Sequence, residues 1–175
     1  MAEVHIIGEL ESGRGFPSSR LQCRFQLQLG GGWKLLGGKN EGQTQADAPD
    51  VCDEAYFCHP IDVHLSTKSI QAWPKFHVQV YHHDEFGRQA LCAYGSVHVP
   101  TSPGHHRVEC PTWRPTGSAS EEALHRFVGG GLVLRSVEDL FEGQGRDGLA
   151  TTAMGTVVFD VSIVLRNFDK FGIEC

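Results

Sequence analysis

The sequence predicts an all-β protein, an antiparallel β-sandwich of about eight strands with one short helix. Three observations support this fold class. Apolar and polar residues alternate in several segments, clusters of turn-forming residues separate those segments, and a single stretch carries a helical pattern. With 175 residues, the chain is long enough to bury a core of its own, and residues 1–175 are expected to form one domain.

The clearest alternation lies in residues 20–29, where Leu, Cys and Phe at odd positions alternate with Arg and Gln at even positions. Residues 75–80 and 157–166 repeat this pattern. Successive side chains of a strand point to opposite faces. Each segment is therefore predicted to be a strand with one buried and one solvent-facing side.

Weaker patterns and turn signals divide the rest of the chain into short pieces. Further strands are predicted at residues 4–10, 43–47, 55–65 with a break near His59 and Pro60, 91–99, and 106–110. Turns are predicted at residues 11–15, 30–32, 37–38, 84–87 and 101–104. This spacing is typical of a sandwich or barrel.

One helix is predicted after Ser118, because Glu121 follows it at capping-box spacing before an apolar run that ends at residues 129–131, which are all glycine. Residues 143–155 are rich in glycine and polar side chains. We expect this segment to be a long loop that returns to the last strand.

Charge and hydropathy limit the function classes. The 15 Lys and Arg residues against 21 Asp and Glu leave a net charge of −6, which argues against a nucleic-acid partner. The sequence has neither an 18-residue apolar run nor the basic and apolar start of a signal peptide. We expect an intracellular protein whose six cysteines are free thiols.

Histidine and cysteine groupings do not predict a metal or catalytic site. His82 and His83 are adjacent in a predicted strand, so their side chains would point to opposite faces. Cys52 and Cys58 with His59 lack the further ligands of a zinc site. No nucleophile-elbow motif is present, and neither a cofactor nor a catalytic residue is predicted.

Acidic residues in loops raise the alternative of a calcium site, since calcium binds clustered oxygen ligands. The candidates are Asp47, Asp50, Asp53, Asp84 and Glu85. The chain lacks the aspartate pairs, spaced two residues apart in one loop, that chelate calcium. Solvated turn residues are therefore the favoured interpretation.

Aromatic and basic residues that neighbour one another in loops suggest recognition surfaces, because large amphipathic rings and Arg are enriched at interfaces. Packing of these rings at the sheet edge is the competing interpretation. The interface candidates are Trp33, Lys34, Trp73, Arg88, Trp113 and Arg114.

A succession of short loop motifs runs along essentially the whole chain: Trp33–Gly37, Glu41–Gln45, His59–Asp62, Phe86–Arg88, Tyr94–Gly95, His98–Pro100, Ser102–Gly104, Cys110–Pro115, Phe127–Gly131 and Leu165–Gly172. Their order and spacing resemble those of the B9-domain family. Each motif alone is weak, but their succession is specific.

The resemblance implies a C2-like β-sandwich without enzymatic activity or calcium dependence. It also implies a role at the ciliary basal body and transition zone. There the protein would be a subunit of the tectonic-like, or Meckel-syndrome, complex that restricts traffic between plasma and ciliary membranes. Other B9-domain proteins are the expected partners. Among the motif residues, Gly95 and Pro100 are expected to hold turns.

A peripheral phospholipid-binding module is the alternative function. Lys34, Lys39 and Arg88 would then contact anionic head groups. The negative net charge weakens this alternative, because stable adsorption usually needs a cluster of basic residues or a second anchor.

Overall fold

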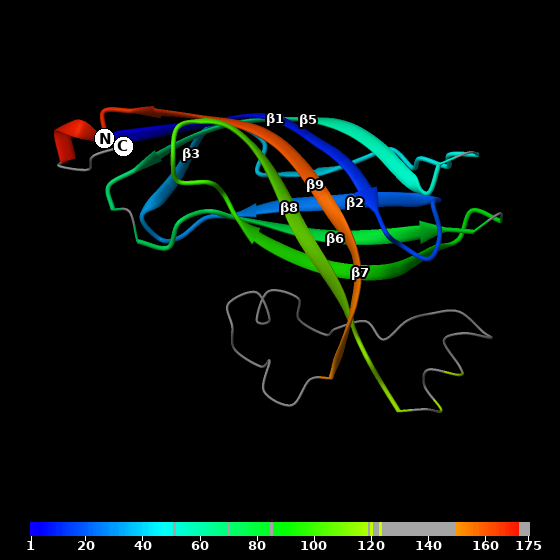
Figure 1. The fold of residues 1–175 in the computed structure, drawn as a ribbon. Helices are drawn as coiled ribbons and strands as arrows, with labels where there is room; N and C mark the ends of the chain where they lie inside the picture. The colour runs from blue at the N-terminus through cyan, green and yellow to red at the C-terminus, as the bar shows by residue number, and fades with distance from the viewer. Residues whose placement is uncertain are drawn as a thin grey trace.

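The computed structural model describes residues 1–50, 52–69, 71–84, 86–118, 120, 123 and 150–171, and most of these residues lie in antiparallel strands (Figure 1). The strands are β1 (Ala2–Arg14), β2 (Leu21–Gln28), β3 (Trp33–Gly38), β4 (Glu41–Gln43), β5 (Glu54–Thr67), β6 (Lys75–His83), β7 (Gln89–His98), β8 (Gly104–Pro115) and β9 (Thr151–Arg166). The predicted all-β class is confirmed, with nine strands in the described part rather than about eight.

All nine strands belong to one sheet, in the order β3-β5-β1-β9-β8-β7-β6-β2-β4. The sheet curls over between β7 and β8, which share two residue pairs, Tyr94 with Trp113 and Gly95 with Thr112. As Figure 1 shows, β1, β5 and β9 form a first layer above a second layer of β2, β6 and β7, while β8 crosses between the two layers. The sandwich thus consists of two layers of a single curled sheet.

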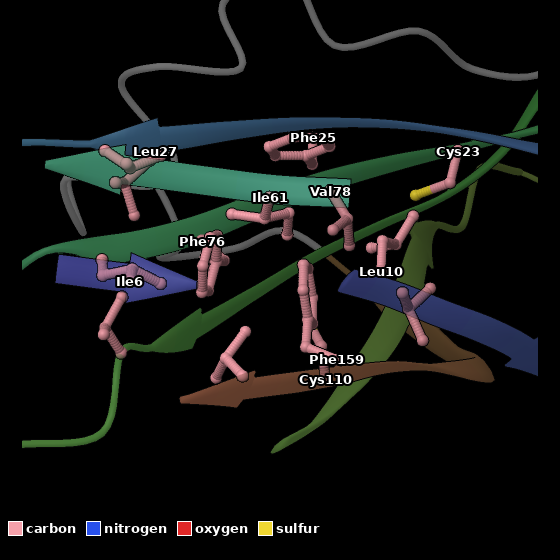
Figure 2. Close-up of a cluster of buried hydrophobic side chains, with 14 of the residues drawn as sticks. Ile6, Leu10, Cys23, Phe25, Leu27, Ile61, Phe76, Val78, Cys110 and Phe159 are labelled. Carbon is pink, nitrogen blue, oxygen red and sulfur yellow. The ribbon is translucent and has the colours of Figure 1, made fainter. Parts of the chain in front are cut away.

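The core lies between the two layers and draws on both (Figure 2). In the second layer the side chains at the odd positions of β2, including Leu21, Cys23 and Leu27, are buried in this core, as the alternation predicted. Phe76 of β6 and Phe159 of β9 stack in its middle, with ring centroids 4.6 Å apart. The layers are therefore held together by apolar contact as well as by the curled backbone.

Three strands include residues that the sequence-based prediction assigned to turns or to a loop. Residues 33–38 form β3 on the sheet edge beside β5, although the glycines at 37 and 38 were predicted to form a turn. Residues 11–14, also predicted as a turn, continue β1. Residues 151–155, predicted as the end of a loop, begin β9. Backbone pairing to long neighbouring strands outweighs the local preference of glycine for turns.

The predicted break near His59 and Pro60 is a β-bulge rather than an interruption. Strand β5 runs through this point, and its register against β1 shifts between Leu10 and Ser12. Cys58 has a positive φ of 43°. A bulge of this kind bends the strand and increases its local twist without ending it.

Gly95 does not hold a turn, so that expectation is wrong. It lies within β7, where a Cβ atom would come within 2.9 Å of both Cys110 Sγ and Val78 Cγ2. Glycine is needed here because the strand approaches its neighbours closely, not because the backbone turns. Pro100 does follow the end of β7, in the connection to β8.

The predicted helix after Ser118 and the first part of the predicted loop, residues 143–149, lie largely outside the described residues. The two described residues within the predicted helix, Ser120 and Ala123, are helical. A short 3₁₀ turn, η1 (Asp169–Phe171), was not predicted by the sequence patterns. No helix in the described part is long and apolar enough to cross a membrane.

Candidate functional site

The solvent-facing side of the first layer, called the outer face below, spans β3, β5, β1, β9 and β8. Residues paired directly across antiparallel strands point to the same side. Four rows of such residues cross the outer face: Lys34-Ser66-Glu3-Arg166, Gly37-His64-His5-Val164, Asp62-Ile7-Ser162-His105 and Pro60-Glu9-Asp160-Arg107.

Exposed apolar side chains lie on three strands of the outer face, β1, β9 and β3. Ile7 and Val164 are 48% and 51% exposed and occupy diagonal positions on β1 and β9. Leu36 is 45% exposed and stands in the bulge of β3 opposite His64. Apolar residues surrounded by polar ones are typical of the core and rim of a protein interface.

Charged side chains surround these apolar residues and form ion pairs across strands. Arg107 of β8 binds Glu11 of β1 at 2.9 Å, and Arg166 of β9 lies 3.6 Å from Glu3. Exposed pairs of this kind contribute little to stability. They instead give the rim of the outer face a fixed pattern of charge that a partner can match.

The outer face also brings His5 and His64 together with Glu3, a grouping that the sequence analysis missed. The two histidines are 59 positions apart in the sequence and become neighbours because β1 pairs with β5. Local spacing contains no signal for such a group. It follows only from the register of two strands.

Trp33 and Trp73, two of the predicted interface residues, pack against each other. Trp33 is only 8% exposed, and its ring meets that of Trp73 edge to face at 5.0 Å. Its indole Nε1 donates a hydrogen bond to the Gln71 carbonyl at 3.3 Å. The neighbouring Lys34 is exposed on the outer face. At this end of β3 the lysine, rather than the tryptophan, offers surface to a partner.

Trp113 and Arg114 lie together in β8 and are both partly buried. The ring of Trp113 rests against Tyr94 of β7, with centroids 5.6 Å apart. This position, where the sheet curls, is separate from the end of β3 that holds Trp33. The structure therefore does not gather the predicted aromatic residues into one patch.

Arg88 lies in the turn between β6 and β7, at the other end of the sandwich from Lys34. Trp33 contacts Trp73 just before β6 begins, whereas Arg88 follows its end. A strand rises about 3.3 Å per residue, so the nine residues of β6 separate the two cations by about 30 Å. Lys34 and Arg88 cannot act as one basic cluster.

Two of the carboxylates considered for calcium, Asp84 and Asp47, accept hydrogen bonds from backbone N–H groups. Asp84 Oδ1 accepts hydrogen bonds from the backbone N–H groups of Phe86 and Arg88, and Asp84 Oδ2 lies 2.9 Å from Arg88 Nε. The backbone hydrogen bond from Arg88 is the main cause that lowers the pKa of Asp84. Asp47 Oδ2 accepts a hydrogen bond from the Tyr56 N–H. The bonds of Asp84 are typical of a turn residue, whereas the bond of Asp47 reaches strand β5.

The cysteines of the described part, Cys23, Cys52, Cys58, Cys92 and Cys110, are all free thiols, as predicted. Burial raises the pKa of Cys23 and raises that of Cys110 to about 12. A thiol with so high a pKa is not ionised at neutral pH and is a poor nucleophile. These two cysteines act as small core residues.

Comparison with known proteins identifies the family. The family model B9-C2, described as "Ciliary basal body-associated, B9 protein", matches residues 4–164. The chain is 51% identical to B9 domain-containing protein 2 of Danio rerio over 99% of both chains, and 49% identical to that of Homo sapiens over 100% of both. The chain belongs to the B9 protein family, and it is a cilium-related protein of a basal body-associated group.

Two more distant similarities were found. B9 domain-containing protein 1 of Mus musculus is 27% identical over 97% of this chain and 84% of its own length. The C2A domain of plant extended synaptotagmin 1 is similar in structure over 93% of both chains, with 9% identity and a TM-score of 0.45. The B9-C2 family name agrees with the C2-like fold that the loop motifs implied.

Proposed function

We propose that this chain is a non-enzymatic assembly subunit that binds other B9-domain proteins within the tectonic-like, or Meckel-syndrome, complex of the ciliary transition zone. In this role it supports ciliogenesis and the diffusion barrier between ciliary and plasma membranes. The observation that carries the proposal is the full-length similarity to B9 domain-containing protein 2. The similarity to B9 domain-containing protein 1 supports a set of related subunits.

The outer face is our proposed contact surface for a second B9 domain. It carries exposed apolar residues, Ile7 on β1, Val164 on β9 and Leu36 on β3, together with ion-paired charged residues. The first layer is also bounded by β3, an edge strand that pairs with β5 on one side. Lasting complexes bury a continuous surface of this composition, with a few central residues contributing most of the affinity.

The other predicted residues define two competing contact sites. Arg88 and the 82% exposed Phe86 form one at the β6–β7 turn, where the guanidinium lies 5.6 Å from the ring centroid. Trp113 and Arg114 form the other at the curl between β7 and β8. The three sites lie apart, so substitutions distinguish them.

Co-expression of this chain with B9 domain-containing protein 1, followed by size-exclusion chromatography, tests the assembly. Val164→Asp on the outer face should abolish co-elution, whereas Phe86→Asp at the β6–β7 turn should leave it intact. Both variants place one charge at an exposed apolar position, so they form a matched pair. If the two folded wild-type chains never co-elute, the assembly proposal fails. If Phe86→Asp alone disrupts the complex, the outer face is the wrong surface.

Lipid binding is less well supported by the arrangement of charges. Lys34 and Arg88 lie at opposite ends of the sandwich, and stable adsorption needs clustered cations. Flotation with vesicles of anionic phospholipid at low salt provides the test. Binding that is lost in Lys34→Glu or Arg88→Glu would favour the lipid module instead.

A further inference from the structure

His5 of β1 and His64 of β5 face each other directly across the outer face. Their rings stack with centroids 3.7 Å apart and planes inclined by 17°. Glu3, the next residue of β1 on the same side, places its Oε2 atom 3.4 Å from His64 Nε2. One nitrogen from each imidazole and one oxygen of the carboxylate all lie within 4.8 Å of one another.

The His64 Nε2 atom is buried and has no hydrogen-bond partner. A buried polar atom without a hydrogen bond costs free energy, and most such atoms in native proteins are hydrogen-bonded. Its ion-pair partner is the Glu3 carboxylate, whose Oε2 atom lies 3.4 Å away, but no hydrogen bond joins the two atoms. The group therefore has a polar atom that a cation, placed between the imidazole and the carboxylate, would satisfy.

We propose that Glu3, His5 and His64 form a binding site for a divalent first-row transition metal, with Zn²⁺ and Cu²⁺ as the preferred ions. Neutral imidazole suits both metals, and a carboxylate completes a three-ligand set with an open position. Water or a ligand from a docked partner fills the remaining coordination positions.

Metal capture needs one small rearrangement. Nitrogen lone pairs lie in the ring plane, so two parallel rings do not direct them to one point. The χ2 torsion of histidine is broad, and rotation of one ring about it brings the nitrogens toward a common centre. The backbone positions, fixed by the pairing of β1 with β5, need not change.

Arg166 limits the affinity of the site. Its NH1 atom lies 3.6 Å from Glu3 Oε2 and competes with a metal for the same carboxylate. Removal of the arginine should free that oxygen. This gives a variant that is expected to bind metal more tightly, a gain that misfolding cannot produce.

Isothermal titration of the tag-free chain with ZnCl₂ and with CuCl₂ tests the site. Cys52, Cys58 and Cys175 are replaced by serine, because thiolates also bind zinc. One metal per chain should bind at pH 7.5, above the ordinary histidine pKa of about 6.5. His5→Ala and His64→Ala should each lower the affinity by more than about 100-fold, since even an outer-shell partner of a metal ligand is typically worth 10- to 100-fold.

The matched control is His105→Ala. His105 also pairs with a carboxylate on the outer face, Asp160 at 3.1 Å, but has no second histidine opposite it. His105→Ala should bind metal as the wild type does, and Arg166→Gln should bind more tightly. For bound Cu²⁺, electron paramagnetic resonance should show coupling to two nitrogens. No stoichiometric binding by the wild type, or unchanged binding by His64→Ala, overturns the proposal.

Discussion

Phe76 of β6 and Phe159 of β9 stack with ring centroids 4.6 Å apart and planes inclined by 16°. The two residues belong to opposite layers of the curled sheet, and neither exposes its side chain to solvent. Their contact is the middle of the core in Figure 2. The stability of the sandwich should therefore depend strongly on this pair.

Phe159→Ala should lower the free energy of unfolding by about 3–5 kcal/mol, because a buried ring is lost and a cavity remains. Urea denaturation followed by circular dichroism measures this change. Val164→Ala, on the same strand but exposed, should stay within about 0.5 kcal/mol of the wild type. Equal losses in both variants would contradict a core that is centred on this stack.

Gly95→Ala should destabilise the protein by about 1–3 kcal/mol, the usual cost of added volume in a packed core. The new methyl group would press on Cys110 Sγ and Val78 Cγ2, both 2.9 Å from its position. Gly31→Ala is the control, because no atom lies within 4 Å of its Cβ position. Thermal unfolding of the two variants makes the comparison, and similar melting temperatures would refute the close approach at Gly95.

The free cysteines should react with thiol reagents in an order set by burial. Cys52 and Cys58 are exposed, whereas Cys23 and Cys110 are buried. Burial also raises the pKa of both core thiols, which leaves little reactive thiolate. Iodoacetamide at pH 8, followed by peptide mass spectrometry, should modify the exposed pair first. Early modification of Cys23 in folded protein would show that the core opens readily.

The free energy of unfolding should decrease as the pH is lowered below 6.5, and His77 should cause part of this decrease. Burial, assisted by the nearby charges of Lys75 and His98, lowers the pKa of His77 from 6.5 to about 4. Between these values the unfolded chain binds a proton that the folded chain does not, so stability decreases as the pH falls from 6.5 to 4. Above pH 6.5 the group is neutral in both states and makes no pH-dependent contribution.

His77→Gln should remove this part of the pH dependence, which amounts to at most about 1.4 kcal/mol per pH unit. Urea denaturation at pH 7.5, 6.0, 5.0 and 4.5 gives the two stability curves. His105→Gln, at an exposed position on the other layer, should keep the slope of the wild type. If the wild-type and His77→Gln curves stay parallel down to pH 4.5, the buried neutral imidazole is not the cause.

The sequence by itself determined the fold class and the family. The alternation in residues 21–27 reports which side chains are buried, because a strand turns successive residues to opposite faces. The ordered loop motifs identified a B9 protein. Neither inference needs distant contacts, since one depends on local periodicity and the other on the linear order of residues.

Only the tertiary structure decided where the glycine-rich edge strand pairs and which surface residues meet. The glycines at 37 and 38 favour a turn locally, yet β5 offers a long partner for β3. Gly95 resembled a turn residue until its contact with Cys110 was known. Glu3, His5 and His64 become one group only through the register of β1 and β5. Strand register brings together residues that are far apart in the chain, and local sequence patterns do not specify which of these residues become neighbours.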